Sequence, residues 1–117
     1  MSKDDYFVIV YYILKYLYFC LKHGKNAEEE IIMLKEYPAH IESSYIAYIL
    51  SKMQESGYIE GVNIIESPSL GIGRTKIIKD INRIEITPKG IEYLLDNSMM
   101  LKAYDKLKKF KDIMPFI

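Results

Sequence analysis

The sequence predicts a winged helix-turn-helix, which is a mainly α fold with a small β-hairpin (α+β) and here an additional C-terminal helix. Helical periodicity runs through the first half of the chain up to Gly57. The next segment is rich in β-branched residues and is interrupted by glycines, which is typical of a hairpin. A new helix then opens at Thr87-Pro88. At 117 residues the chain fits one winged-helix domain, residues 1–117.

Composition limits the classes of partner. The 16 Lys and Arg residues equal the 16 Asp and Glu residues, so no net charge attracts the whole molecule to nucleic acid or membranes. Residues 1–60 nevertheless carry a net charge of −3 and residues 61–117 a net charge of +3, so an anionic partner is expected to meet the second half. The single cysteine, Cys20, excludes an intramolecular disulfide and favours a cytoplasmic location.

The first helix, expected over Asp5–Lys22, is the most apolar segment. Fifteen of the sixteen residues in the range 6–21 are apolar, and Lys15 is the exception. The run is shorter than the roughly 20 residues that a membrane helix needs. We therefore expect a helix buried on most sides and no membrane partner. A second copy of the chain would also cover such a helix, which predicts a homodimer through the first and the C-terminal helices.

Turn residues divide the rest of the helical half. His23-Gly24 is expected to end the first helix. Asn26 and Glu29 form a capping-box pattern that predicts a second helix over Ala27–Lys35. A third helix is expected over Glu42–Ser56, because apolar residues recur there at spacings of three and four. These residues are Ile46, Ile49, Leu50 and Met53.

The third helix is the candidate recognition helix. If its apolar stripe faces the core, hydroxyl groups on the opposite side enter the major groove, as in a helix-turn-helix. The residues assigned to this DNA contact are Ser44, Tyr48, Ser51 and Lys52. The N-terminal half of the helix lacks the Arg, Asn or Gln that usually read guanine and adenine, and Glu42 and Glu55 repel the DNA backbone. A solvated face without a ligand is the alternative interpretation.

The wing is predicted from strands over Tyr58–Ile65 and Lys76–Ile86, with Gly61 at a bulge and residues 67–75 at the tip. Cations on a hairpin can hold DNA phosphates or enter the minor groove. The wing cations are Arg74, Lys76, Lys79 and Arg83. Exposed apolar residues at a loop apex instead mark protein contacts. The candidates for such a contact are Leu70 and Ile72.

Two helices are expected after the wing. Thr87-Pro88 opens the first, over residues 88–96, because Thr is a good N-cap and Pro is tolerated at the first helical position. Ser98 is expected to cap the second, over residues 98–113, which places apolar and basic side chains on opposite faces. The lysines predicted to attract the DNA backbone are Lys102, Lys106 and Lys109. The alternative is a solvated face on a packing helix.

Two segments resemble the YjcQ-like family of small bacterial and prophage proteins. The range Leu50–Val62 is similar to that family's passage from helix to strand. The range Ile86–Leu95, followed by Lys102–Lys108, is similar to its C-terminal passage. The resemblance covers residues 41–113. It implies a winged-helix-like fold and an origin in a mobile element, for a family without an established biochemical role.

Enzymatic and cofactor sites are not expected. Cys20 and His23 are one turn apart, but His40 stands alone and a structural zinc site needs four ligands. The sequence Gly71-Ile72-Gly73 lacks the Lys and the following helix of a phosphate-binding loop. We therefore expect neither an enzyme nor a bound metal or cofactor.

Two functions remain open at this point. The first is a small DNA-binding regulator of phage or mobile-element type, which acts in transcription and contacts double-stranded DNA through the third helix and the wing. The second is a protein-interaction module that modulates a replication, transcription or defence protein of the host without binding DNA. The wing cations favour the first function. The zero net charge and the apolar wing tip favour the second.

Overall fold

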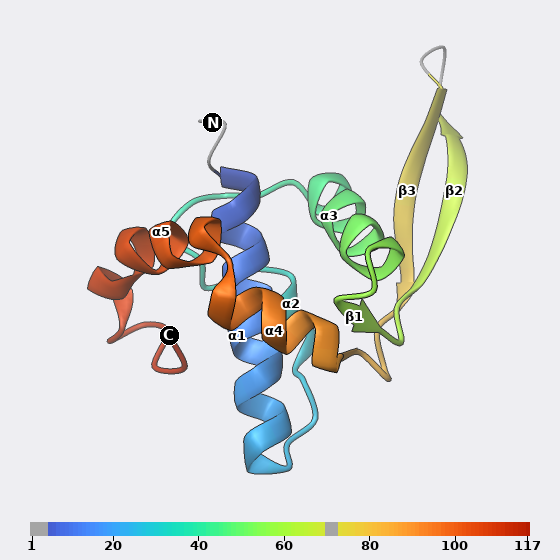
Figure 1. Ribbon diagram of the computed structural model, residues 1–117. Coiled ribbons are helices and arrows are strands. Elements are labelled where there is room, and N and C mark those ends of the chain that lie inside the picture. The colour runs from blue at the N-terminus through green and yellow to red at the C-terminus, as the bar shows by residue number, and fades with distance from the viewer. Residues whose placement is uncertain (1–4, 70–72) are drawn as a thin grey trace.

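The computed structural model confirms the predicted α+β winged-helix class (Figure 1). It describes residues 5–69 and 73–117, except for the side chains of residues 68, 69, 73 and 74. The helices are α1 (Asp5–His23), α2 (Glu29–Ile32), α3 (Ser43–Glu55), α4 (Pro88–Asp96) and α5 (Ser98–Leu107), with a 3-10 turn at Lys108–Phe110. The strands are β1 (Ile59–Glu60), β2 (Asn63–Ser69), β3 (Gly73–Asp80) and β4 (Glu85–Ile86).

Helix α1 forms the centre of the fold, and α3, α4 and α5 pack around it (Figure 1). Ten of its residues are buried within the single chain, and Ile9, Ile13 and Leu14 have no exposed surface. The chain's own core therefore accounts for the apolar run, and burial of α1 gives no support to a homodimer through this helix. Within the described residues, no helix combines the length and hydropathy that crossing a membrane requires.

Helix α2 is much shorter than the predicted range 27–35. Its N-cap is Glu28, without a side-chain capping bond, so the predicted capping box at Asn26 is wrong. The Glu28 amide instead donates to the Tyr16 hydroxyl of α1 at 2.9 Å. The helix cannot extend to residue 35, because Leu34 adopts a left-handed conformation with φ of 59°.

The wing consists of two separate antiparallel pairings where two long strands were predicted. Strands β1 and β4 pair at its base, and β2 and β3 form the projecting hairpin. Gly61, with φ of 86°, separates β1 from β2, and the predicted irregularity falls between Asn63 and Ile64. Pairing reaches Ser69 opposite Gly73, so most of the predicted tip over residues 67–75 belongs to the strands.

Side-chain caps fix both C-terminal helices. The Thr87 hydroxyl accepts a hydrogen bond from the Gly90 amide at 3.0 Å, as predicted for the start of α4. The cap of α5 is Asn97, whose side-chain oxygen accepts from the Met99 amide at 2.8 Å, so the prediction of Ser98 as the cap is wrong. Asn97 is extended and also ends α4, so one residue separates the two helices.

Candidate nucleic-acid interface

Helix α3 and the β2–β3 hairpin lie side by side, with β3 against the helix (Figure 1). A shallow cavity of about 280 Å³ lies between them. Ser43 and Ser44 line it from α3, and residues 75–78 line it from β3. Glu29 of α2 and Met33, which directly follows α2, complete the lining. The first turn of α3 and the wing therefore contribute to one surface.

The exposed face of α3 is narrower than predicted. Ser44 is exposed and Tyr48 is 43% exposed, so both are available to a ligand. Ser51 is 8% exposed, and its predicted outward position is wrong. Ser51 follows Ala47 by one helical turn, and Ala47 is also buried. The packing of β3 beside α3 makes the buried face of the helix wider than its apolar stripe.

Lys52 and Lys76, two of the predicted DNA-binding cations, already have acidic partners. The Lys52 ammonium lies 3.3 Å from the Glu55 carboxylate and 5.6 Å from the centre of the Tyr48 ring. The Lys76 ammonium lies 3.2 Å from the carboxylate of Glu66, directly opposite on the hairpin. A phosphate would have to compete with these carboxylates.

Lys79 and Arg83 are exposed near the base of the wing. The carboxylate of Asp80, between them in the sequence, accepts a hydrogen bond from the side-chain Nδ2 of Asn63 at 2.9 Å. The side chain of Arg74 falls outside the described part of the chain, as do Leu70 and Ile72, the predicted protein contact.

An exposed isoleucine pair lies on the hairpin and was missed by the sequence reasoning. Ile65 and Ile77 are directly opposite in register and are 49% and 43% exposed. Ile64 and Ile78 form the next pair and pack against the core. Successive residues of a strand point to opposite faces, so one member of each isoleucine doublet must face away from the core. The two isoleucine doublets in the sequence could have predicted an exposed isoleucine on each strand. The bulge between Asn63 and Ile64 sets the register and so decides which isoleucine of each doublet faces solvent.

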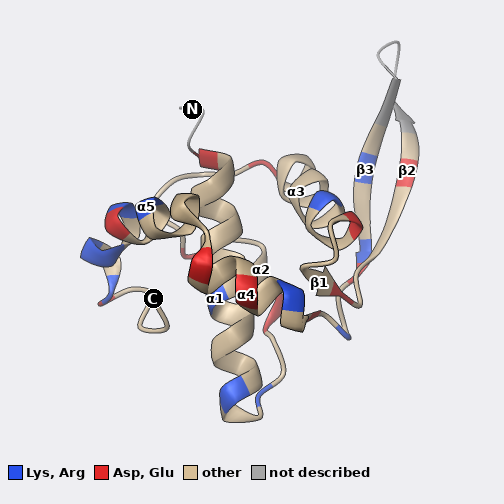
Figure 2. Cartoon of the chain, in the orientation of Figure 1, with Lys and Arg blue, Asp and Glu red and all other residues tan. Residues whose placement is uncertain are grey.

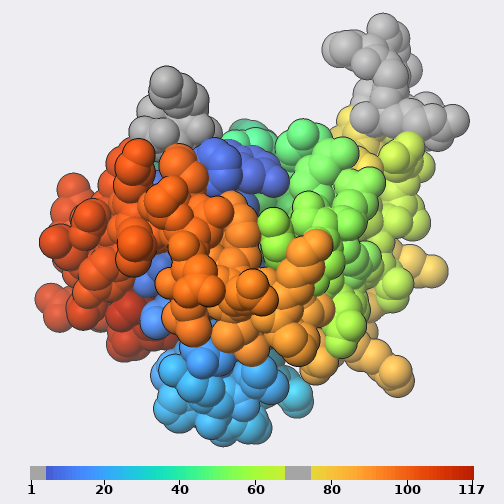
Figure 3. All heavy atoms as spheres, in the orientation of Figure 1, coloured from blue at the N-terminus to red at the C-terminus, as the bar shows by residue number. Residues whose placement is uncertain are grey.

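The lysines of α5 and of the 3-10 turn that follows it form a second, separate basic group, because α5 ends at Leu107 and not at residue 113 as predicted. Lys102, Lys106 and Lys109 are exposed, as predicted, while the opposite side of α5 packs against α1. Helix α5 and the hairpin lie on opposite sides of α1 (Figure 2). The space-filling view places them at opposite ends of one face (Figure 3). The cations of α5 and of the wing therefore do not form one continuous stripe.

A tyrosine cluster borders α3 on the side of α4. The rings of Tyr58 and Tyr93 stack with 4.3 Å between their centres, and the Lys89 ammonium lies 5.6 Å from the centre of the Tyr58 ring. Burial raises the pKa of Tyr6, Tyr45 and Tyr93 above the usual value. The cluster combines side chains from α1, α3, the turn before β1 and α4. The helical periodicity of a single segment could not reveal it.

The residues that could suggest metal or nucleophile chemistry lie apart. Cys20 is buried, as predicted, and burial raises the pKa of its thiol, which disfavours the reactive thiolate. His23 is exposed, with Nδ1 2.8 Å from the Phe19 carbonyl oxygen. His40 lies 3.2 Å from the Glu42 carboxylate. Within the described ranges, no group of three His, Cys, Asp or Glu residues could hold a metal ion.

The central helix, the α3 face and the adjoining hairpin define the chain as a winged-helix protein. A family model described as YjcQ protein matches residues 11–113, so the chain belongs to this family. The match includes most of α1 and all of α2, beyond the resemblance found over residues 41–113. Comparison with curated proteins finds no significant match, and neither does comparison with solved structures.

Proposed function

We propose that this protein is a small winged-helix DNA-binding regulator of phage or mobile-element type, which acts in transcription in the cytoplasm. The observation that carries the proposal is the position of the exposed first turns of α3 beside a projecting hairpin with exposed cations at its base. In this class of fold, the helix enters the major groove and the neighbouring elements contact the backbone.

The proposed contacts use hydroxyl groups for the helix and cations for the wing. Ser44 and Tyr48 donate hydrogen bonds to phosphates or base edges. Lys79 and Arg83 hold the DNA backbone. The α5 lysines are left out of this interface because they lie on the other side of α1.

The proposed affinity is weak and depends on salt. Two or three phosphate contacts give a slope of about −2 to −3 in a plot of log K against log salt concentration. The first turns of α3 hold no bidentate reader, and the Gln54 side chain near its end is bonded to the Val62 backbone. Discrimination between sequences is therefore small, since a good bidentate pair supplies roughly 1–3 kcal/mol.

The test is a fluorescence-anisotropy titration of a labelled mixed-sequence duplex at low and moderate salt. The variant Lys79→Ala/Arg83→Ala should weaken binding and bring the salt slope closer to zero by about two units. The matched control Lys102→Ala/Lys106→Ala removes the same charge from α5 and should bind like the wild type. No binding at low salt, or an equal loss in both variants, contradicts the proposal.

The Ile65–Ile77 pair favours a second candidate function, a protein-interaction module without DNA binding. Two opposed isoleucines, each more than two-fifths exposed, place apolar surface on a projecting hairpin. In this alternative a host or phage protein covers the pair. Ile77→Asp should then abolish retention of the partner in a pull-down. A partner retained equally by the variant contradicts this alternative.

A further inference from the structure

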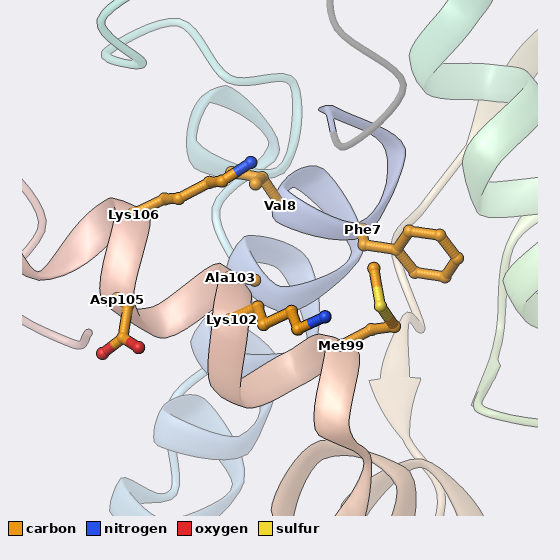
Figure 4. Close-up of a pocket in the computed structure, with 7 residues that line it drawn as sticks. All are labelled: Phe7, Val8, Met99, Lys102, Ala103, Asp105 and Lys106. Carbon is orange, nitrogen blue, oxygen red and sulfur yellow. The ribbon is translucent and has the colours of Figure 1, made fainter.

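A groove of about 300 Å³ lies between the N-terminal half of α1 and helix α5. Its apolar lining comes from both helices and consists of Phe7, Val8, Met99 and Ala103. The side chains of Lys102 and Lys106 extend from α5 toward α1 (Figure 4). The third charged residue, Asp105, directs its carboxylate away from α1 (Figure 4). The groove therefore combines an apolar floor with a cationic rim.

The sequence of α5 produces this arrangement. Lys102 and Lys106 are four residues apart, so they lie on one side of the helix. Ala103, which is 2% exposed, is small and leaves room between the two helices. Met99 adds a flexible side chain that can adapt to a ligand. The lysine stems can cover apolar surface while their ammonium groups stay in water.

The local charge selects an anionic partner. From Lys102 to Asp112 the chain carries five lysines and two acidic residues. The carboxylate of Asp105, which also lines the groove, lies 3.6 Å from the Lys108 ammonium. Two lysines, Lys102 and Lys106, and one acidic residue, Asp105, line the groove, so carboxylate groups of a partner complement the lysines of its rim.

We infer that this groove is a docking site for an acidic amphipathic helix of a partner protein. Its apolar side chains enter between Phe7 and Met99. Its carboxylates, one turn apart, pair with Lys102 and Lys106. Helix-in-groove recognition requires these two features, namely apolar anchors and complementary flanking charges. The groove is at the lower end of ligand-pocket volumes, which suits one or two side chains.

The site goes beyond the proposed DNA contact and does not depend on it. A nucleic-acid backbone would satisfy the lysines but leave the apolar floor uncovered. The groove lies across α1 from the wing, so one chain could hold DNA and an acidic partner at separate surfaces.

The test uses the full chain and a labelled synthetic peptide of about 15 residues, long enough to form a helix when bound. Leucine occupies positions i, i+3, i+4 and i+7, and glutamate occupies the other positions. A second peptide has lysine in place of every glutamate. Anisotropy should show binding of the acidic peptide at micromolar concentration and no binding of the basic one. Absence of binding by the acidic peptide overturns the inference.

Charge reversal locates the site. K102E/K106E should lose at least tenfold in affinity for the acidic peptide and should gain binding of the basic peptide. The matched control K109E/K111E makes the same charge change beyond the groove and should stay within about twofold of the wild type, since distant exposed charges are screened. Equal loss in both variants, or full retention by K102E/K106E, overturns the inference. All four lysines are exposed, so the fold should persist in both variants.

A separate NMR measurement tests whether the peptide contacts the apolar floor of the groove. Acidic peptide should shift the methyl NMR signal of Ala103 in the groove and leave that of Ala47, on the buried face of α3, unchanged. Dodecanoate provides the competing ligand class, with one carboxylate and an acyl chain. Saturable binding of dodecanoate without binding of the peptide overturns the inference in favour of a lipid. Since none of these measurements includes DNA, their failure is distinct from failure of the DNA proposal.

Discussion

The Thr87 hydroxyl donates a hydrogen bond to the Gly57 carbonyl oxygen and so joins the end of α3 to the start of α4. The same hydroxyl accepts from the Gly90 amide, and the Thr87 amide donates to the Tyr58 carbonyl oxygen at 3.0 Å. Helix α3 ends at this corner, and the wing both begins and ends there, with β1 and β4. Thr87 therefore helps to set the angle between the two elements that form the candidate interface.

Thr87→Val should destabilise the protein by about 2–3 kcal/mol, because it removes an N-cap and leaves the Gly57 carbonyl without its donor. Thr87→Ser keeps the hydroxyl and should cost less than about 1 kcal/mol. Urea unfolding at neutral pH measures both changes. Equal stability of the Val and Ser variants would show that the hydroxyl does not hold the corner.

Gly90→Ala should be among the most damaging substitutions of a glycine. A Cβ atom at position 90 would overlap the carbonyl oxygen of Tyr58, which lies in the turn between α3 and β1. We expect a loss of about 3 kcal/mol or more, as for overpacking that backbone shifts cannot relieve. Gly24→Ala is the matched control. Its site is open but its φ is 62°, so strain of about 1–2 kcal/mol is expected. Thermal unfolding of both variants would contradict this ranking if Gly24→Ala were the less stable.

Local signals in the sequence predicted the corner but not its surroundings. Thr87 and Gly57 were identified because a cap and a helix stop depend on neighbouring residues alone. The burial of Ser51 depends on where the hairpin packs, and the spacing of apolar residues within α3 cannot predict that position. The left-handed Leu34 and the outward Ile65 likewise depend on contacts with distant residues and on a bulge. The architecture was therefore predictable, whereas the exposed face of the candidate site was predicted only in part.

Tyr48→Phe should separate a DNA contact from a structural role. Tyr48 is 43% exposed, so loss of its hydroxyl should change stability by no more than about 0.5 kcal/mol. If the hydroxyl donates to DNA, duplex affinity should fall about two- to tenfold, the equivalent of a net hydrogen bond. Anisotropy titration measures the change. Tyr93→Phe is the control in the neighbouring cluster and should leave the affinity unchanged. An unchanged affinity for Tyr48→Phe would remove this side chain from the proposed interface.

The buried phenols and the thiol make stability sensitive to alkali. Burial raises the pKa of Tyr11 and Tyr16 to about 12 and also raises that of Cys20. The raised values mean that the folded state keeps protons that the unfolded state releases. The stability that these protonated phenols and the thiol contribute is therefore fully present below the ordinary thiol pKa of about 9. This contribution is lost as the pH rises toward 12. Urea unfolding across this range should give a free energy of unfolding that is constant up to about pH 9 and then falls.

Tyr11→Phe isolates one of these groups. It keeps the buried ring and removes the titrating hydroxyl, so the loss of stability between about pH 10 and 12 should be shallower by up to about 1.4 kcal/mol per pH unit. At neutral pH the Phe variant should unfold at nearly the same urea concentration as the wild type. The difference in tyrosinate absorbance between the wild type and the variant, followed in the same samples, reports Tyr11 and should appear only with unfolding. If Tyr11 ionised in the folded protein near pH 10, the free energies of unfolding of the wild type and the variant would fall with the same slope against pH. That result would show that burial does not protect this hydroxyl.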